Sequence, residues 1–444
     1  MRARFKKAVE VVSETFWVVP GLITLTGIIL ALALVDVDRS GMLPAWLIDS
    51  AWLYNGGSTG ARTLLGAVAS STIGVAGTVF SITIAALSLA AGQMGPRLLR
   101  NFTKDRGNQV TLGAFLGTFS YSLMVLRTVR SEEEGAFVPH LSLTFGIILA
   151  FVCVGTLVYF VGHMAGRINV DTVVDLVSDD LGKAMQRLTV KARQPGPPAL
   201  GFWDGAEPVA DDRRGYLQQL DAAGLAKWAV ENDASVLLLV RPGGYVFPGA
   251  PIAFVKPRLE AAGDAIRSAT ALGPQRGSSA DIEFAVRQLV EVAVRALSPG
   301  INDPLTAISV IDRLGAALCD LVPLHLPTGV VIERGHPVLV VPSVDYDGLV
   351  DGMFHMIRQN GSDSTAVLIR ILDVLTAVVS LERDPVRVAT LQRHADLVLD
   401  DASRHITSRP DLRDVRGRHQ GFAAMKDRGP LGHLVAMASS QNPK

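Results

Sequence analysis

The most prominent pattern in the chain is an uncharged run from Leu64 to Ala91, flanked by Arg62 and Arg97 with no charged residue between them. Three further apolar segments, 16–35, 110–126 and 141–163, lie in the first 165 residues. About 20 apolar residues in a helix cross the roughly 30 Å hydrocarbon core of a bilayer. The pattern predicts four transmembrane helices in residues 1–165, of which 64–91 is long enough to tilt or protrude.

Charged residues in the links between these segments predict the orientation of the helices. Basic side chains precede the first segment and fill the link between the second and third: Arg2, Arg4, Lys6, Lys7, Arg97, Arg100, Lys104 and Arg106. The link after the third segment instead carries the acidic run Glu132–Glu134. Because basic loops stay on the cytoplasmic side, we expect cytoplasmic N- and C-termini, with residues beyond Met164 in the cytosol.

The second segment is unusual in its small and hydroxyl-bearing side chains. They recur at three- and four-residue intervals: Gly66, Ser70, Gly74, Gly77, Thr78 and Ser81. On a helix such rows let backbones approach closely, or line a path for water and ions. The sequence leaves pore lining and helix packing open as alternatives. The lack of Asp, Glu or Lys inside the spans disfavours a carrier built on intramembrane carboxylates.

Beyond residue 165 the pattern is typical of a water-soluble α+β domain. Residues 166–200 are expected to form a connecting helix, with apolar positions Val173, Val174, Val177 and Leu181, and then a linker rich in proline and glycine. Short apolar runs between proline and glycine turns predict a small β-rich module at 201–257. The fold class is therefore an integral membrane α-helical protein with a C-terminal cytosolic α+β domain.

The rest of the domain, 258–408, is expected to be mainly helical, beginning with a helix over 258–272. Two short strands are predicted near Val330 and Leu339. The final segment, 409–444, is expected to be a loose tail because glycine, proline and basic residues are scattered through it.

The most distinctive turn of this domain is SPGINDP, residues 298–304. Pro299 and Gly300 end one predicted helix, 280–297, while Asn302 or Asp303 caps the next. Pro304 then takes the first helical position, where its missing N–H costs nothing. Backbone chemistry alone therefore accounts for these residue types.

Composition agrees with a chain divided between lipid and water. Of 444 residues, 49% are hydrophobic, and the mean hydropathy of +0.32 is too high for a soluble protein of this length. The 42 basic residues balance 42 acidic ones, so no nucleic-acid partner is expected. Two cysteines, Cys153 and Cys319, exclude a disulfide framework.

Several stretches together resemble a known family. They are GYLQQLD (215–221), RPGGYVFPGAPIAFV (241–255) and GPQRGSSADIEFAVRQLVEVAVRALSPGINDPLTAI (273–308), placed after four apolar segments. This arrangement resembles a bacterial family of predicted membrane proteins catalogued as a domain of unknown function, from the first span to about residue 400. The resemblance implies this architecture and a bacterial inner-membrane location, but no reaction and no site residues.

Candidate chemistry is sparse. The sequence contains no P-loop, HExxH motif or Ser/His/Asp order, so we expect no enzyme activity, no cofactor and no metal. His394 and His405, eleven positions apart on one predicted helix, are a weak exception. The most promising polar set comprises Arg276, Asp281, Glu283, Arg287, Asn302 and Asp303. These residues would bind a small ligand or ion, or form a salt-bridge network that fixes the SPGINDP turn.

Two functions fit these observations. The first is a homo-oligomeric inner-membrane ion channel or channel-like transport protein, gated by its cytosolic domain, with the second span at the axis. The second is a membrane-anchored sensory protein that binds a ligand or partner without transport. The expected partners are the lipid bilayer, further copies of the chain, and a small ion or ligand.

Overall fold

The computed structural model describes residues 16–40, 54, 56–94, 105–130, 137–167, 169–276 and 281–441. The chain divides into two compact units, of which one is mainly Glu10–Gly92 with Pro96–Asn169 and the other is mainly Val170–Lys444. Most of the charged flanks that predict helix orientation lie outside the described residues, namely Arg2–Lys7, Arg97–Lys104 and Glu132–Glu134.

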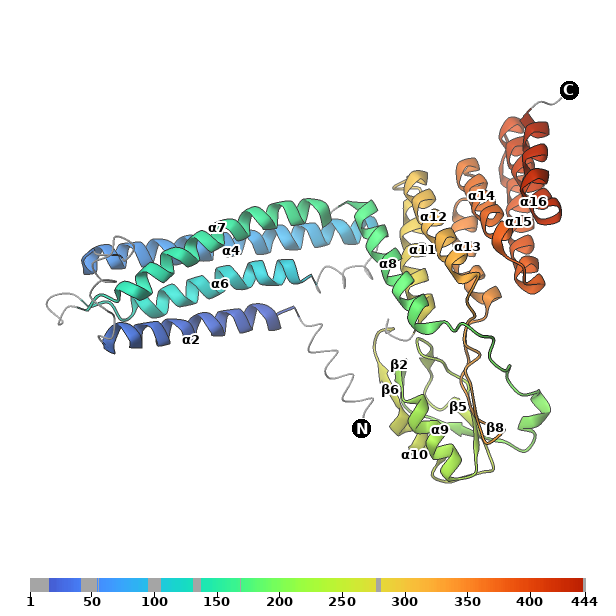
Figure 1. Cartoon of the computed structure of the whole chain (residues 1–444), viewed down its shortest axis with the longest axis horizontal. Helices are drawn as coiled ribbons and strands as arrows, with labels where there is room; N and C mark the ends of the chain where they lie inside the picture. The colour runs from blue at the N-terminus through green and yellow to red at the C-terminus, as the bar shows by residue number, and fades with distance from the viewer. Residues whose placement is uncertain are drawn as a thin grey trace. The chain divides into compact units, whose positions relative to one another are not determined.

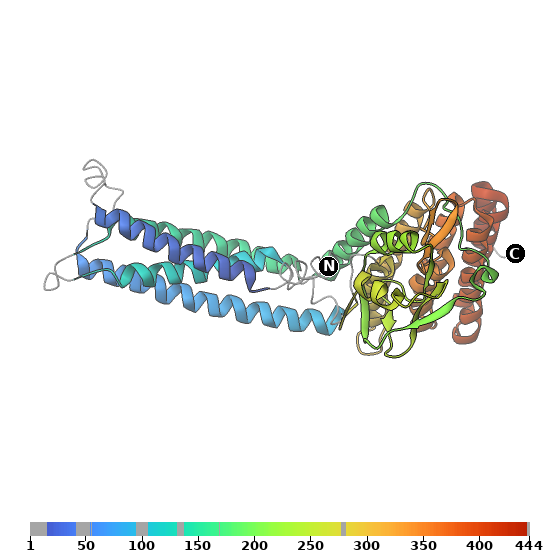
Figure 2. The same cartoon turned by 90° about the horizontal axis from the view of Figure 1, so that it is seen from below.

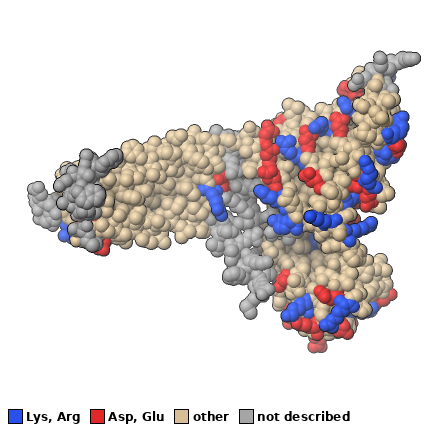
Figure 3. Space-filling view, in the orientation of Figure 1, with Lys and Arg blue, Asp and Glu red and all other residues tan. Residues whose placement is uncertain are grey.

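The described residues of the first unit form four long helices: α2 (Val18–Ser40), α4 (Ser58–Met94), α6 (Arg106–Leu126) and α7 (His140–Arg167). The helices lie side by side in both views (Figures 1 and 2). Each is long and apolar enough to cross a membrane, which confirms the prediction of four such helices. Large apolar side chains such as Leu25, Ile29, Phe151 and Val158 are exposed on them. The visible face of this unit carries charge only near its ends (Figure 3), a surface consistent with contact to lipid.

Helix α6 is the most buried helix of this unit. Of its apolar stretch 56% is buried, against 22–28% for the other three helices. It packs against α2 through glycines, since a Cβ on Gly27 would lie 2.6 Å from the carbonyl oxygen of Gly117. A Cβ on Gly113 would lie equally close, at 2.6 Å, to Cδ1 of Ile23. The four-residue spacing of Gly113 and Gly117 thus brings two helix backbones together.

Two carboxylates close the ends of the four-helix unit. Asp38 of α2 accepts hydrogen bonds from the backbone N–H of Ser142 at 2.9 Å and from its hydroxyl at 2.6 Å, and so caps α7. Asp105 caps α6, and its Oδ2 lies 2.7 Å from Nε2 of His163 in α7. At 1.5 Å per residue, Ser142 and His163 are about 32 Å apart along α7, close to the thickness of a hydrocarbon core.

The second unit combines two sheets with helices. Its helices are α8 (Val170–Leu188), η3 (Leu200–Trp203), α9 (Ala222–Glu231), α10 (Ala262–Ala269), α11 (Ile282–Ala296), α12 (Pro304–Leu321), α13 (Tyr346–Asn360), α14 (Thr365–Leu381), α15 (Pro385–His405) and α16 (Arg409–Gln441). Its strands are β1 (Glu207–Ala210), β2 (Gly215–Leu220), β3 (Ser235–Leu238), β4 (Tyr245–Val246), β5 (Pro251–Lys256), β6 (Thr270–Gly273), β7 (Val330–Glu333) and β8 (His336–Val340).

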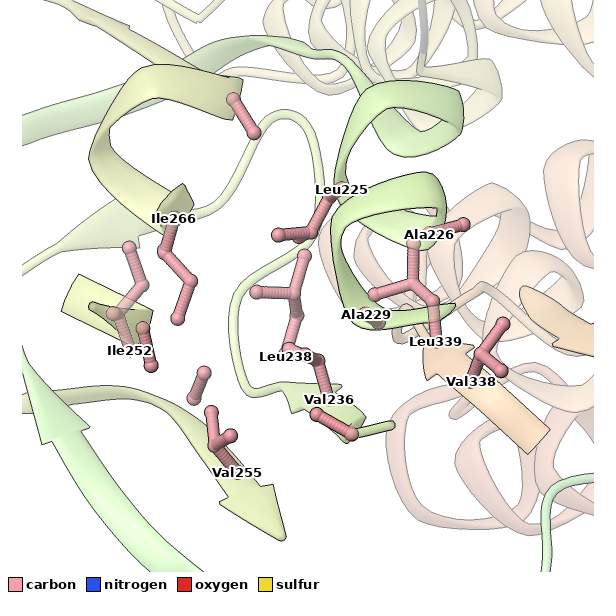
Figure 4. Packing of buried hydrophobic residues seen from close by; sticks show 14 of the residues in the cluster. Leu225, Ala226, Ala229, Val236, Leu238, Ile252, Val255, Ile266, Val338 and Leu339 are labelled. Atoms are coloured by element: carbon pink, nitrogen blue, oxygen red, sulfur yellow. The ribbon is translucent and has the colours of Figure 1, made fainter. Parts of the chain in front are cut away.

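The larger sheet has the strand order β1-β5-β3-β8-β7 and the smaller one β4-β2-β6. Strands β3 and β8 run parallel, with Val236 opposite Leu339, while the other pairs are antiparallel. Leu225 and Ala229 of α9 pack with Leu238 of β3 in the core beside the sheet (Figure 4). Burial of these apolar side chains holds the helix on the strands.

The structure differs from the sequence-based expectation in how the sheets are completed. The helix expected over 258–272 is shorter, because Thr270–Gly273 pairs with β2 as strand β6. The β-rich module expected at 201–257 also gains β7 and β8 from 330–340. A boundary at residue 257 therefore divides strands of the same sheets.

The expected loose tail, 409–444, was a wrong prediction for its described part. Residues Arg409–Gln441 form α16, which contains a kink at Gly429 and Pro430. Val415 and Phe422 are fully buried, and Arg418 pairs with Asp373 of α14 at 3.3 Å. Tertiary packing of these few side chains overrides the scattered glycine and proline.

The helix–turn–helix around SPGINDP forms as its backbone chemistry predicts. Helix α11 is amphipathic, and its apolar side chains, such as those of Ile282, Val286 and Leu289, are buried. Asp303 caps α12 through hydrogen bonds from the backbone N–H groups of Leu305 at 3.1 Å and Thr306 at 3.2 Å. Asn302 adopts the left-handed conformation, with φ 50°, and Pro304 begins the helix.

The glycine contact between α2 and α6 predicts a specific sensitivity. Replacing Gly27→Ala places a Cβ against the backbone of α6, which we expect to destabilise the protein by about 1–3 kcal/mol through overpacking. Gly155→Ala in α7, where a Cβ meets nothing within 4 Å, is the matched control. Thermal unfolding in detergent, followed by loss of the monodisperse species, should show a lower midpoint for Gly27→Ala alone. Equal midpoints would contradict the close packing.

Candidate functional site

Four of the six candidate ligand-binding residues meet in one ion-pair network at the start of α11. Arg276 pairs with Asp281 at 2.5 Å and with Glu283 at 3.0 Å. Glu283 also accepts from Arg287 at 3.4 Å and from Arg241 at 2.7 Å, in the segment after β3. Burial alone would raise the pKa of Glu283. The positive charge of Arg241 and the hydrogen bond from Arg276 outweigh burial and hold that pKa below its usual value of 4.5.

The other two candidates, Asn302 and Asp303, lie beyond the opposite end of α11. Glu283 lies in the first turn of α11, whose 15 residues rise by about 22 Å toward the SPGINDP turn. The side chain of Asp303 is engaged in capping α12 and accepts from the hydroxyl of Thr306 at 2.6 Å. The six candidate residues therefore do not form one group, because the charged network and the SPGINDP turn lie at opposite ends of α11.

The network depends on a glycine that sequence reasoning did not single out. Gly243 has φ 86°, in the left-handed region, and follows Arg241 and Pro242 in the turn after β3. A Cβ there would collide with the Asp281 carboxylate and approach Nε of Arg276 at 2.8 Å. Only glycine combines this conformation with this approach. The two consecutive glycines of the RPGG sequence, residues 241–244, are the feature of the sequence that could have indicated this turn.

Two clefts share the segment Val341–Val344, and the smaller of them adjoins the network. The smaller, about 180 Å³, is lined by Arg241, Asp281 and apolar residues that include Leu188 and Ile282. The larger, about 640 Å³, reaches from Leu237–Leu239 toward α13 and α15. Its polar lining comprises Arg193, Gln194, His325, Thr328, Ser343, Asp345, Asp384 and Arg387. Its size falls in the range of small-molecule sites.

The position of these clefts follows from the sheet. Strands β3 and β8 are parallel, so their carboxyl ends, at Leu238 and Val340, lie at the same edge. In open α/β sheets ligands bind outside the carboxyl ends of parallel strands, where the chain departs in different directions. Mainly apolar walls with a few polar groups are what a small organic ligand requires.

The candidate residues of α4 occupy a face that the described chain leaves uncovered. The buried side of this helix is another row: Ala61, Leu65, Ala69, Thr72, Ala76, Val79, Thr83 and Ala86. A Cβ on Gly66, Gly74 or Gly77 would meet no described atom within 4 Å. Ser70, Thr78 and Ser81 are exposed and donate their hydroxyls to carbonyls of their own helix. Within the described residues, this row makes no helix–helix contact in the chain.

One group of the described residues has the composition of a metal site: Asp351, His355 and His394. His394 is fully buried. Burial, reinforced by the positive charge of Arg393, lowers the pKa of His394 to about 4, so that its imidazole is neutral at pH 7. The sequence suggested His405 as the companion of His394, whereas the structure places His355 beside it.

The Glu283 network predicts a pH-dependent contribution to stability. Glu283→Gln leaves three arginines without their shared carboxylate, at a cost of about 1–3 kcal/mol. Because the folded-state pKa is depressed, this contribution is present above pH 4.5 and is lost as the pH falls below it. Urea unfolding followed by tryptophan fluorescence should show a lower free energy of unfolding for Glu283→Gln than for the wild type at pH 7. The difference between the two proteins should be smaller in acid. Glu231→Gln, an exposed partner of Lys227, should change stability by less than about 0.5 kcal/mol.

Comparisons with known proteins agree with this architecture. The chain matches the family described as "Predicted membrane protein (DUF2254)" over residues 13–377. An uncharacterized protein of Mycobacterium tuberculosis (strain CDC 1551 / Oshkosh) is 32% identical over 436 residues, which cover 94% of this chain and 82% of that protein. An uncharacterized protein of Mycobacterium bovis shows the same identity and coverage. No solved structure matches the chain significantly. The chain belongs to the predicted membrane protein family DUF2254.

Proposed function

We propose that the protein is a homo-oligomeric channel or channel-like transport protein of the bacterial inner membrane, with cytoplasmic termini and with α4 at the contact between copies. The observation that carries the proposal is the uncovered face of α4. This helix already packs within the chain through alanine and threonine, yet presents a second row of small residues, including Gly74, Gly77 and Ser81, on its outer side.

Such a row has little use against lipid, because lipid tails pack equally well against leucine. Between helices it permits close contact, and around an axis its hydroxyl oxygens, at Ser70, Thr78 and Ser81, line a path for water and ions. The chain passes from α7 through residues 168–169 into α8, which offers a covalent route by which the C-terminal unit would gate the path.

The proposal predicts a defined oligomer and ion flux. The double variant Gly74→Leu and Ser81→Leu fills the outer face without entering the chain's own core, and should weaken association by about 1–2 kcal/mol, which is roughly 5- to 30-fold. Particle mass in nanodiscs and ion flux from liposomes should both fall. Gly155→Leu in α7, also an uncovered position, is the control. Monomeric wild-type protein that is silent for every ion tried would refute the channel.

A second candidate is a membrane-anchored sensory protein that binds a ligand in the cleft at the carboxyl ends of β3 and β8. It is favoured by the larger cleft, about 640 Å³ with apolar walls and polar groups at Arg193 and His325. Under this proposal the ligand has an apolar body and a polar end, as such a lining would select.

The cleft proposal predicts that filling the cleft abolishes binding. Ser343 lines both clefts, so Ser343→Trp would fill them. Glu260 is exposed and lines neither cleft, so Glu260→Trp is the control. Full-length protein in detergent would be screened by thermal shift against nucleotides and carboxylic acids. A probe that raises the midpoint of wild type and of Glu260→Trp, but not of Ser343→Trp, supports the site. Shifts that persist in Ser343→Trp place binding elsewhere.

A further inference from the structure

Three metal-ligating side chains converge between α13 and α15, outside both clefts and the Glu283 network. Asp351 and His355 are four positions apart on α13 and so share one face of the helix. His394 projects from α15. Nε2 of His394 lies 2.9 Å, and Nε2 of His355 3.0 Å, from Oδ1 of Asp351. One carboxylate oxygen therefore faces two imidazole nitrogens.

The spacing of these donor atoms suits a small divalent cation. Zinc binds imidazole nitrogen at about 2.0–2.1 Å and carboxylate oxygen at about 2.0–2.2 Å, so tetrahedral neighbours stand roughly 3.4 Å apart. The two separations from Oδ1 therefore need to widen by only about half an ångström or less. All three donor atoms lie within 4.8 Å of one another. Small side-chain rotations suffice to form a three-ligand site.

The burial of the group is uneven, as an accessible metal site requires. His394 is completely buried, with its ring centroid 6.1 Å from that of Phe354. The side chains of Asp351 and His355 are each about one-third exposed, at 32% and 31%. An ion can thus enter from the solvent side, and a fourth position stays open there.

His394 is poorly explained as a structural hydrogen-bonding residue. Its Nδ1 is buried and finds no hydrogen-bond partner within the described part of the chain. Its polar contact is through Nε2, directed at Asp351. Burying a polar ring for one hydrogen bond costs free energy. A metal bond at Nε2 would replace this single hydrogen bond by a stronger interaction, while Nδ1 would carry the ring proton and keep no partner among the described residues.

Neighbouring charges are compatible with a cation. Arg393 donates to Oδ1 of Asp351 at 2.6 Å and also to Asp347 at 2.8 Å, so it keeps a carboxylate when Asp351 binds an ion. Binding through Nε2 of His355 requires the proton on Nδ1. Arg358, whose NH2 lies 3.5 Å from that Nδ1, already pairs with Asp401 and can remain there.

We propose that Asp351, His355 and His394 bind one divalent transition-metal ion of the zinc class, with an open position for water or a further ligand. Two imidazoles and one carboxylate select such ions over magnesium and calcium, which prefer all-oxygen sites. The ion joins α13 to α15. This site departs from the expectation, drawn from sequence, that the chain holds no metal, and it is independent of both proposed functions.

Metal titration of the full-length protein tests the site. Protein purified in detergent without a polyhistidine tag is stripped with EDTA and titrated with Zn²⁺ by calorimetry and with Co²⁺ by visible absorption. We expect one ion per chain and visible bands typical of four- or five-coordinate cobalt. His355→Gln and Asp351→Asn should each weaken binding by at least about 10–100-fold. His405→Gln, on the same helix as His394, should bind as wild type does.

Both variants change partly exposed side chains, and an unchanged elution profile will show that they fold. His394→Gln is a less secure test because the residue is fully buried. The inference is overturned if wild type binds less than one Zn²⁺ per chain at tens of micromolar. It is equally overturned if His355→Gln and Asp351→Asn retain wild-type affinity, or if Mg²⁺ binds as well as Zn²⁺ does.

Discussion

The close approach of α2 and α6 at Gly27 and Gly117 is the contact on which the four-helix unit depends. It brings two backbones together where neither helix carries a side chain, and it places α6, the least apolar of the four helices, inside the unit. Helix α4 then packs on the remaining side through its alanine row, contributing Ala61 and Leu65 to one core cluster and Ala76 to another. Its glycine and serine row is left on the outside. The arrangement that closes the unit is thus also the one that leaves uncovered the face that we propose for association.

Local signals predicted much of the fold. Uninterrupted apolar runs gave the four long helices, and cap chemistry at Asp303 and Pro304 gave the start of α12. The sequence could not show which glycines are used, because the four-residue spacing in α4 resembles that of Gly113 and Gly117, and only the partner helix distinguishes them. The sequence did not predict helix α16 for a related reason, namely that tertiary contacts decide its structure. Two buried side chains, Val415 and Phe422, outweigh a composition typical of a tail.

In the C-terminal unit the decisive contacts are between residues far apart in sequence. Sequence reasoning grouped Arg276, Asp281 and Glu283 because they are neighbours on the chain, and the structure does pair them. It could not predict that Arg241, which follows β3, also pairs with Glu283. It could not predict the clefts either, because they depend on the parallel pairing of β3 with β8, about a hundred residues later in the chain. It also linked the network to the SPGINDP turn, although a full helix separates them. The sequence also did not predict that His355 and His394 lie side by side, because they belong to different helices that are brought together only by tertiary packing.

The cap that Asp38 places on α7 has a consequence for biosynthesis. The carboxylate belongs to the first of the four helices, whereas the N–H groups that it binds belong to the last, about a hundred residues later in the chain. While the ribosome is still producing the intervening segments, Asp38 has no such partner and the start of α7 does not yet exist. The contact between Asp38 and the start of α7 can therefore form only once all four helices have been synthesised, so that the first helix acquires these hydrogen bonds last.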